Sequence, residues 1–427
     1  MADTSPSPTL PTASIFRHRA FALFWTGMTL ITFASQIEAV TIGWQVYSIG
    51  RQTGSIEEAA FLVGMVGLVQ FGPMFVLTLF AGSLADRISR RAIVVTAIAT
   101  EALGVVALTI TAMQDKPSLA VIFFIAALFG ASRAFFRPAA WAMMPMLVPT
   151  AEVARAISTS SIGSEIAVIF GPWLGGLLVA HSTATAYGVT AAIYGLGLVV
   201  ILTIRQSTTP ERQFGNHLTQ IREGLVYVWQ NKIIFGAISL DLFAVLLGGA
   251  TALLPAFASD ILNVGPTGFG ILRSGPAIGA GLMALALSRW PLKRHAGVRM
   301  FWAVAGFGLA TIVFGLSRSL WLSVAALAML GAADMISVYV RQTLMQIVTP
   351  DHMRGRVSSV SGLFIAGSNE LGEFESGVVS RFVGPVMAVI LGGIGTLIVT
   401  GAWALMFPEL RRADRLDGQA HETPKDG

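Results

Sequence analysis

The sequence predicts an all-α integral membrane protein with twelve transmembrane helices arranged as two pseudo-symmetric six-helix bundles. Charged residues make up only 12% of its 427 residues, apolar residues make up 54%, and the mean hydropathy is +0.71. Soluble globular chains carry roughly 25% charged residues. A chain this poor in charge fits a bilayer, where lipid tails replace water around the outer helices. Twelve long apolar stretches and an alternation of basic loops support the same fold.

A helix needs about 20 predominantly apolar residues to cross a membrane. Stretches of this kind lie at 20–47, 61–84, 92–113, 118–146, 156–180, 184–204, 232–259, 268–289, 299–316, 320–347, 355–382 and 384–407. The longest connection between them carries an amphipathic pattern, with Leu218, Ile221, Leu225, Val228 and Trp229 on one helical face. This pattern predicts an interfacial helix that links the two bundles.

The stretches divide the chain into five segments. We expect a flexible N-terminal tail at 1–15, a first bundle at 16–204, a cytoplasmic linker with the amphipathic helix at 205–231, a second bundle at 232–407 and a cytoplasmic tail at 408–427. The first segment is rich in Pro, Ser and Thr and lacks the basic-then-apolar pattern of a signal peptide. Insertion would then be driven by the first apolar helix.

Basic residues predict the orientation of the chain in the membrane. With both termini in the cytoplasm, 20 of the 28 Lys and Arg residues fall in cytoplasmic loops and tails, and 5 fall on the outside. This asymmetry agrees with the positive-inside rule. It also accounts for the net charge of +5 without a nucleic-acid partner.

Several classes of chemistry are disfavoured by what the sequence lacks. It has no cysteine, which excludes disulfides, thiolate metal sites and thiol catalysis. None of its six histidines pairs with another at ligand spacing, so we expect no metal site. There is no Ser/His/Asp set to suggest catalytic residues, and no Walker-type loop to suggest ATP-driven pumping. We expect neither an enzyme nor a cofactor.

The two halves of the chain align with each other as an internal repeat. At an offset of 201 residues, Gly130-Ala131 falls on Gly331-Ala332, Pro149 on Pro350, Arg155 on Arg356 and Gly176 on Gly377, and at an offset of 203, Gly72-Pro73 falls on Gly275-Pro276. The shared register extends over two spans and their loop. Many secondary transporters use two homologous halves around a central path for alternating access.

The loop between the second and third stretches reads Gly82-Ser-Leu-Ala-Asp86-Arg87-Ile-Ser-Arg90-Arg91. It resembles the loop signature of the major facilitator superfamily, with Ser89 where the family usually has glycine. The resemblance covers about residues 16 to 410. It implies that Asp86, Arg87 and Arg91 help to latch the cytoplasmic side. A basic loop that only sets topology is the alternative.

The fifth stretch contains Gly171-Pro172-Trp-Leu-Gly175-Gly176. It resembles the Gly-Pro-x-x-Gly-Gly motif of exporters and antiporters in that superfamily. Pro172 bends a helix, and the glycines allow tight packing. An ordinary kinked packing helix is the alternative. The loops VPTAEVARA and TPDHMRGRV are similar to those of the branch that contains bacterial enterobactin exporters.

Charged residues inside a membrane are costly and usually face a cavity or a partner. The candidates for a translocation path or proton coupling are Glu38, Arg133, Arg137, Asp241, Asp334, Arg341, Glu370 and Glu373. The repeat places Arg133 in register with Asp334, which suggests an ion pair between the bundles in at least one conformation. The five acids are candidate proton carriers, and for each of them a purely structural role is the alternative.

These expectations describe a secondary active transporter in the bacterial inner membrane that exports a small amphiphilic molecule, such as a siderophore or a drug, in exchange for protons. Its partners would be this small molecule, protons and membrane lipids, and it would act as a monomer. An uptake symporter of the same fold is the nearest alternative. A transport-inactive membrane sensor is a further alternative from another class.

Overall fold

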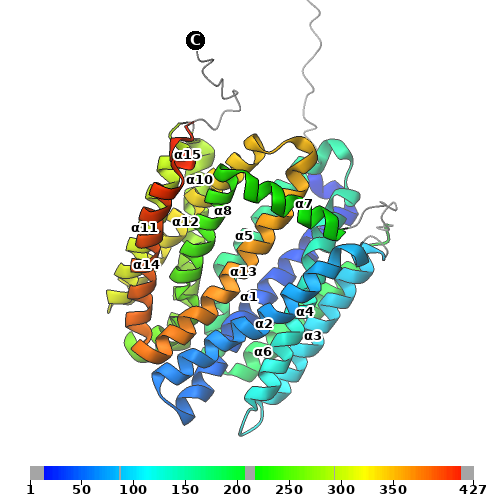
Figure 1. Ribbon diagram of the computed structural model, residues 1–427. Helices are drawn as coiled ribbons and strands as arrows, with labels where there is room; N and C mark the ends of the chain where they lie inside the picture. The colour runs from blue at the N-terminus through cyan, green and yellow to red at the C-terminus, as the bar shows by residue number, and fades with distance from the viewer. Residues whose placement is uncertain (1–13, 86–87, 207–216, 293, 415–427) are drawn as a thin grey trace, which may run out of the picture.

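The computed structural model describes residues 14–85, 88–206, 217–292 and 294–414, and its regular structure in these ranges is entirely helical (Figure 1). A first helix group comprises α1 (Arg19–Thr53), α2 (Ile56–Ala85), α3 (Arg90–Ala112), α4 (Leu119–Met143), α5 (Val153–His181) and α6 (Thr183–Leu202). Short 3-10 turns, η1 (Ile15–Arg17), η2 (Met144–Leu147) and η3 (Thr150–Glu152), flank its helices.

A second helix group follows the linker helix α7 (His217–Gln230). It comprises α8 (Lys232–Gly248), α10 (Gly265–Arg289), α11 (Ala296–Leu316), α12 (Leu320–Val348), α13 (Asp351–Val383) and α14 (Pro385–Met406). Between α8 and α10, the chain continues through η4 (Ala250–Leu253), the short α9 (Leu254–Ala256) and a π-helical turn, η5 (Phe257–Ile261). After α14 comes the short α15 (Pro408–Arg412).

A helix occupies each of the twelve predicted stretches, and the all-α membrane fold is confirmed. The count of twelve crossings is not confirmed, because eleven of the described helices are long and apolar enough by length and composition. The exception is α13, whose 33 residues include Arg354, Arg356, Glu370, Glu373 and Glu375. Its polar residues lower its hydropathy although it packs between α2, α8 and α14.

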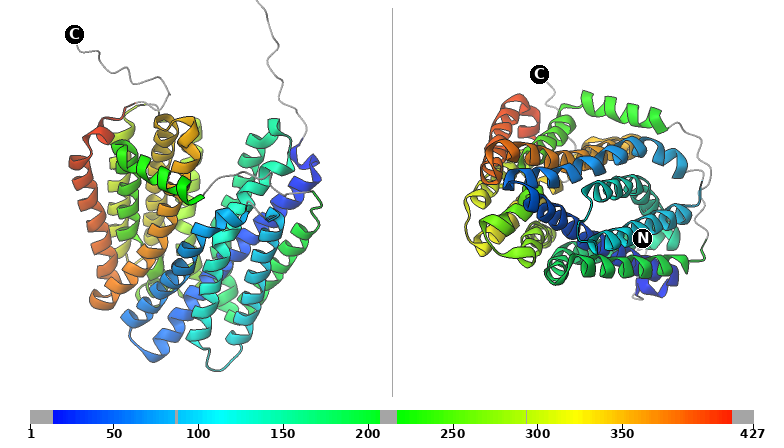
Figure 2. Two further views of the ribbon diagram at one scale, coloured as in Figure 1. Left: turned by 45° about the vertical axis from the view of Figure 1, so that its right-hand side comes forward. Right: turned by 90° about the horizontal axis from the view of Figure 1, so that it is seen from below.

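The two ends of the described chain lie on the same side of the molecule as α7, and we call this the linker side and the opposite one the far side (Figure 1). The two helix groups are close together on the far side and diverge toward the linker side (Figure 2).

Glycines hold the two groups together on the far side. On α2, a Cβ added to Gly64 would lie 2.9 Å from the Cα of Gly377 on α13. On α5, a Cβ added to Gly176 would lie 2.9 Å from the Cα of Gly270 on α10. Contacts this short are possible only without a side chain. The backbones of the two groups therefore touch at two crossings.

The same helices separate toward the linker side. A Cβ added to Gly72 on α2, or to Gly355 or Gly362 on α13, would meet no atom within 4 Å. The α2–α13 pair is thus packed tightly at one end and open at the other. The molecule is in a conformation that opens toward the linker side.

The internal repeat is visible in the helix packing. A Cβ on Gly130 of α4 would lie 2.0 Å from the Gln70 carbonyl oxygen of α2, and one on Gly331 of α12 would lie 1.9 Å from the Pro276 carbonyl oxygen of α10. The two glycines predicted to be equivalent thus each approach a backbone carbonyl on the second helix of their group, although the two carbonyls are about one helical turn apart in the repeat. The repeat is therefore structural as well as sequential.

The linker helix α7 packs on the second group. Its Val228 is buried, Tyr227 donates a hydrogen bond to the Val348 carbonyl (3.2 Å), and Glu223 pairs with Arg356 (2.7 Å). The predicted apolar face is divided, because Leu225 and Trp229 remain exposed while Val228 is covered. The side chain of Leu218 lies outside the described residues.

The boundary of the predicted N-terminal tail needs a correction. Ile15 was expected to close the tail at 1–15, but only 2% of it is exposed, because η1 packs on the first group. Arg17 and His18 next to it both bind the Glu152 carboxylate of η3. The packed part of the chain therefore starts earlier than the apolar pattern indicated.

Candidate functional site

A cavity of about 90 Å³ lies between the two helix groups. Helices α1, α2 and α4 contribute from the first group, and η4, α9, α10 and α13 from the second. Its charged lining residues are Arg133, Arg273, Glu370 and Glu373, and its apolar ones include Phe269. A site shared by both groups changes shape whenever the groups move relative to each other.

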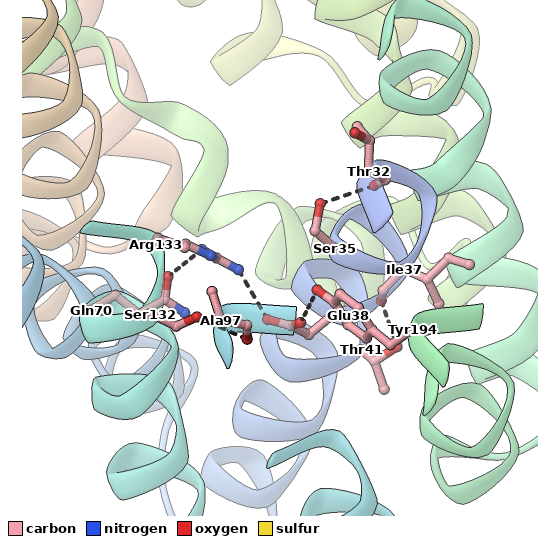
Figure 3. Close-up of polar contacts among 10 residues, drawn as sticks. All are labelled: Thr32, Ser35, Ile37, Glu38, Thr41, Gln70, Ala97, Ser132, Arg133 and Tyr194. Carbon is pink, nitrogen blue, oxygen red and sulfur yellow. Dashed lines mark hydrogen bonds and ion pairs between the residues drawn. The ribbon is translucent and has the colours of Figure 1, made fainter. Parts of the chain in front are cut away.

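Arg133 connects this cavity to the interior of the first group. Its Nη2 donates to Glu38 Oε1 (3.0 Å) and its Nη1 donates to Gln70 Oε1 (2.9 Å) (Figure 3). Glu38 is fully buried, and its second oxygen accepts a hydrogen bond from the Tyr194 hydroxyl (2.8 Å). Four helices, α1, α2, α4 and α6, therefore meet in one polar cluster.

Local packing explains why these side chains can reach one another. Gly130 lets α4 approach the α2 backbone at Gln70. Arg133 follows Gly130 by three residues and so lies on nearly the same face of α4, because a helix has 3.6 residues per turn. The close approach of the two backbones thus brings the Arg133 guanidinium to the Gln70 amide.

The second group contains a comparable pair. Arg341 of α12 forms a hydrogen-bonded ion pair with Asp241 of α8, and both side chains are almost fully buried. Asp334, two turns before Arg341, lies near Asp241. In each group, an acid on the first helix thus binds an arginine on the fourth.

The structure does not form the predicted pair between Arg133 and Asp334. Arg133 binds Glu38 and Gln70 within its own group, and Asp334 lies beside Asp241 and Arg341 in the other. A pair across the two groups in another conformation stays a prediction. The remaining predicted arginine, Arg137, is exposed one turn beyond Arg133 toward the linker side.

Glu370 and Glu373 of α13 line the cavity, and their role in a translocation path stays a prediction. Arg273 of α10 and Arg133 of α4 both lie near Glu373 and Glu370. Arg273 is one of the five basic residues that the predicted topology assigns to the outside of the membrane, but it lines the cavity instead. Arg273 lies within the predicted stretch 268–289 and close to its outer end, which is why it was counted with the outside residues.

A second contact between the groups was not predicted. On the far side, Tyr47 of α1 donates to Asp260 Oδ2 (2.5 Å), and Arg51 Nη2 pairs with Asp260 Oδ1 (3.0 Å). The π-helical turn η5 carries Asp260. We call these three residues the far-side clasp. The sequence did hold a signal for this contact. Arg51 and Asp260 follow the first stretches of the two halves, 20–47 and 232–259, and they carry opposite charges.

The loop motif at 82–91 is only partly described by the structure. Asp86 and Arg87 lie outside the described residues, as does the environment of Gly82. Arg90 donates to the Ala142 carbonyl (2.7 Å) and Arg91 to the Leu202 carbonyl (2.5 Å), so both arginines bind helix ends within the first group. The predicted latching role of this loop stays a prediction.

The motif of α5 mediates close packing on two sides. A Cβ on Gly171 would lie 2.6 Å from the Gln36 side chain, and one on Gly175 would lie 3.1 Å from the Ile37 Cα, both on α1. Gly176 faces α10 of the other group at the crossing described above. Pro172 is buried within α5, and its carbonyl lies against Gly270.

Comparison with known proteins gives the family. A family model described as a transmembrane secretion effector of the major facilitator superfamily matches residues 11–426. The enterobactin exporter EntS of Escherichia coli O157:H7 is 25% identical over 398 residues, which cover 93% of this chain and 95% of that protein. EntS of Shigella boydii serotype 4 is 25% identical over 383 residues, covering 90% and 92%.

Solved structures of transporters share the fold. The peptide transporter POT superposes with a TM-score of 0.74 at 13% identity, over 94% of this chain and 97% of that one. The xylose transporter XylE from E. coli, in an inward-open conformation, gives a TM-score of 0.68 at 12% identity, over 92% and 96%.

The matched family and these neighbours are transporters, which confirms the expectation that the chain is not an enzyme. The matched family and the similar exporters also support a multi-pass protein of the inner membrane that carries a small molecule. A match over almost the whole length, a shared cavity and two repeated helix groups agree with one another. The chain is therefore a member of the transmembrane secretion effectors of the major facilitator superfamily, similar to enterobactin exporters.

Proposed function

We propose that this protein exports a small amphiphilic molecule, such as a siderophore, in exchange for protons. The observation that carries the proposal is the cavity between the groups, where both groups contribute charge: Arg133 from the first, and Arg273, Glu370 and Glu373 from the second. Apolar residues such as Phe269 line the rest. Polar and apolar lining together suit an amphiphile. A drug-sized ligand needs a site of about 300–1,000 Å³, so the cavity of about 90 Å³ would have to widen as the groups move before it could hold the cargo.

The proposed cycle uses the two helix groups, α1–α6 and α8–α14, as two bodies that rock about the cavity. In this conformation, the two glycine crossings and the far-side clasp close the far side. Basic residues are concentrated on the linker side. The positive-inside rule places such loops in the cytoplasm, and we therefore assign the linker side to the cytoplasm. A cargo would enter from that side, and it would leave after the far side opens.

Protons are the proposed coupling ion because the interior holds more acids than it needs to neutralise its arginines. Glu38 and Asp241 each bind an arginine, whereas Glu370 and Glu373 share the neighbouring Arg273. A buried carboxyl group changes its affinity for a proton when a nearby cation moves. Rocking of the groups would move these cations relative to the acids.

Transport in inverted membrane vesicles tests this proposal, with enterobactin as the probe because similar proteins export it. Inverted vesicles with an acidic interior should accumulate enterobactin without ATP, and a protonophore should abolish the accumulation. Accumulation in right-side-out vesicles under an inward proton gradient would instead identify an uptake symporter. Absence of any gradient-dependent flux of this probe or of a panel of amphiphilic drugs would contradict the proposal.

A further inference from the structure

Glu101 of α3 is a buried acid whose surroundings offer it no cation of its own. Its exposed fraction is 7%, and its Oε2 has no hydrogen-bond partner among the residues that the structure describes. An ionised carboxylate with an unpaired oxygen is expensive in a dry interior, since burial of a charge costs several kcal/mol without a partner. The placement of Glu101 therefore needs a chemical explanation.

Glu101 lies beside Glu38, close enough for a hydrogen bond between the two carboxyl groups. Such a bond requires a hydrogen on one of them, because two carboxylates have only acceptors. Arg133 and the Tyr194 hydroxyl both donate to Glu38, at 3.0 Å and 2.8 Å, and so favour its ionised form. The hydrogen therefore belongs on Glu101.

The other groups around Glu101 lead to the same assignment. Ser132 lies beside it, but the Ser132 hydroxyl donates its own hydrogen to the Ala97 carbonyl (3.2 Å) (Figure 3). The ionisable side chains that face Glu101 in the described part of the chain are Glu38 from α1, Arg133 from α4 and Tyr194 from α6. With a neutral Tyr194, two acids and one arginine carry no net charge only when one proton is bound.

We propose that Glu101 holds a proton, donates it in a hydrogen bond to Glu38, and forms with Glu38 the proton site of the coupled transport. Arg133 would transmit the state of the cavity to this pair, because it both lines the cavity and binds Glu38. If Arg133 moves toward the nearby Glu370 when the groups rock, Glu38 loses its cation and its affinity for a proton rises. The pair would then take up a second proton from the side to which the cavity is open, and it would release that proton when Arg133 returns to Glu38.

Infrared difference spectroscopy tests the proton on Glu101 without any cargo. The full-length protein in lipid should show the C=O stretching absorption of buried carboxylic acids, and Glu101→Gln should remove the component that belongs to Glu101. Glu165→Gln serves as the matched control, because Glu165 lies in α5 with an exposed side chain outside the cluster. The assignment is wrong if the band is missing from the unaltered protein, or if it persists unchanged in Glu101→Gln.

A transport measurement tests the coupling role, which rests on the proposed function. Glu101→Gln should lose enterobactin accumulation driven by a proton gradient and keep the movement of enterobactin down its own gradient, whereas Glu101→Asp should keep part of the driven accumulation. If the unaltered protein shows no driven transport, the proposed function fails. If it does and Glu101→Gln retains it in full, only the role of Glu101 fails.

Discussion

At the scale of single residues, the interior is organised around two acid–arginine pairs, Glu38 with Arg133 and Asp241 with Arg341. Both arginines come from the fourth helix of their group. Burial removes these charges from water at a cost that only good geometry and further hydrogen bonds offset. Removal of one partner from such a pair therefore leaves a buried charge without compensation, and this destabilises the folded protein.

The Asp241–Arg341 pair gives a prediction for stability. Arg341→Leu should lower the free energy of unfolding by about 3–5 kcal/mol, because Asp241 would keep a buried charge without a partner. The double variant Asp241→Leu/Arg341→Leu should recover much of that loss. Unfolding in mixed micelles with a denaturing detergent measures both values.

The control for this experiment is an exposed ion pair in the same group. Lys232 and Glu409 are 3.7 Å apart, and their side chains are 72% and 54% exposed. Glu409→Gln should cost less than about 1 kcal/mol. If Arg341→Leu costs as little as this control, the pair has no structural importance.

Sequence alone identified most of the charged residues, but not their partners. Glu38, Arg133, Asp241 and Arg341 were predicted because charges are rare inside apolar helices, and the structure places them in the interior. The repeat gave the register of Arg133 and Asp334, yet register does not fix how helices rotate or where long side chains reach. Asp260 was missed because it follows an apolar span and resembles a loop residue.

At the scale of helices, glycine decides where the two groups meet. Gly176 and Gly377, which the repeat makes equivalent, occupy the α5–α10 and α2–α13 crossings. The sequence predicted tight packing for the α5 motif, and the structure adds which neighbours are touched. Helix contacts across the groups could not be read from the sequence, because they depend on the conformation.

The α5–α10 crossing gives a prediction for packing. Gly176→Ala places a Cβ 2.5 Å from the Pro266 carbonyl oxygen, so the two backbones must separate. We expect a loss of about 1–3 kcal/mol, typical of overpacking. Gly188→Ala is the control, because its Cβ would meet nothing within 4 Å. Thermal unfolding measured by tryptophan fluorescence should separate the two variants, and equal midpoints would contradict the crossing.

The far-side clasp gives a prediction for the conformational equilibrium. Asp260→Asn removes the charge that binds Arg51, a bond worth roughly 1.5–3 kcal/mol when one partner is charged. The far side should therefore open more often. A cysteine in place of Thr251, which lines the cavity, should react several-fold faster with a membrane-impermeant thiol reagent added outside cells.

The matched control for the clasp is Asp115→Asn, since Asp115 is an exposed acid on the far side outside the clasp. When Asp115→Asn is combined with Thr251→Cys, the thiol at position 251 should be labelled at the same rate as in Thr251→Cys alone. The chain has no cysteine of its own, so the introduced thiol is the one that reacts. Equal rates in Asp260→Asn and Asp115→Asn would show that the clasp does not hold the far side closed.

At the scale of the whole molecule, the sequence predicted the fold class, the repeat and the interior charges, because composition, periodicity and register are local properties. The conformation was not predictable from the sequence. The open and closed states differ in many contacts, but their free energies differ by only a few kcal/mol. The crossing predicted at 355–382 is not confirmed by the hydropathy of α13, because this helix carries Glu370 and Glu373, which line the cavity.

The central claim is that the two helix groups open alternately on either side of the shared cavity. Spin labels at positions 162 and 285, on α5 and α10, report the linker side, and labels at 52 and 382, on α1 and α13, report the far side. Double electron–electron resonance measures both distances in lipid. When Asp260→Asn is introduced or the pH is lowered, the distance between labels 162 and 285 should shorten, and the distance between labels 52 and 382 should lengthen. Two distances that change in the same direction, or one that changes alone, would contradict the claim.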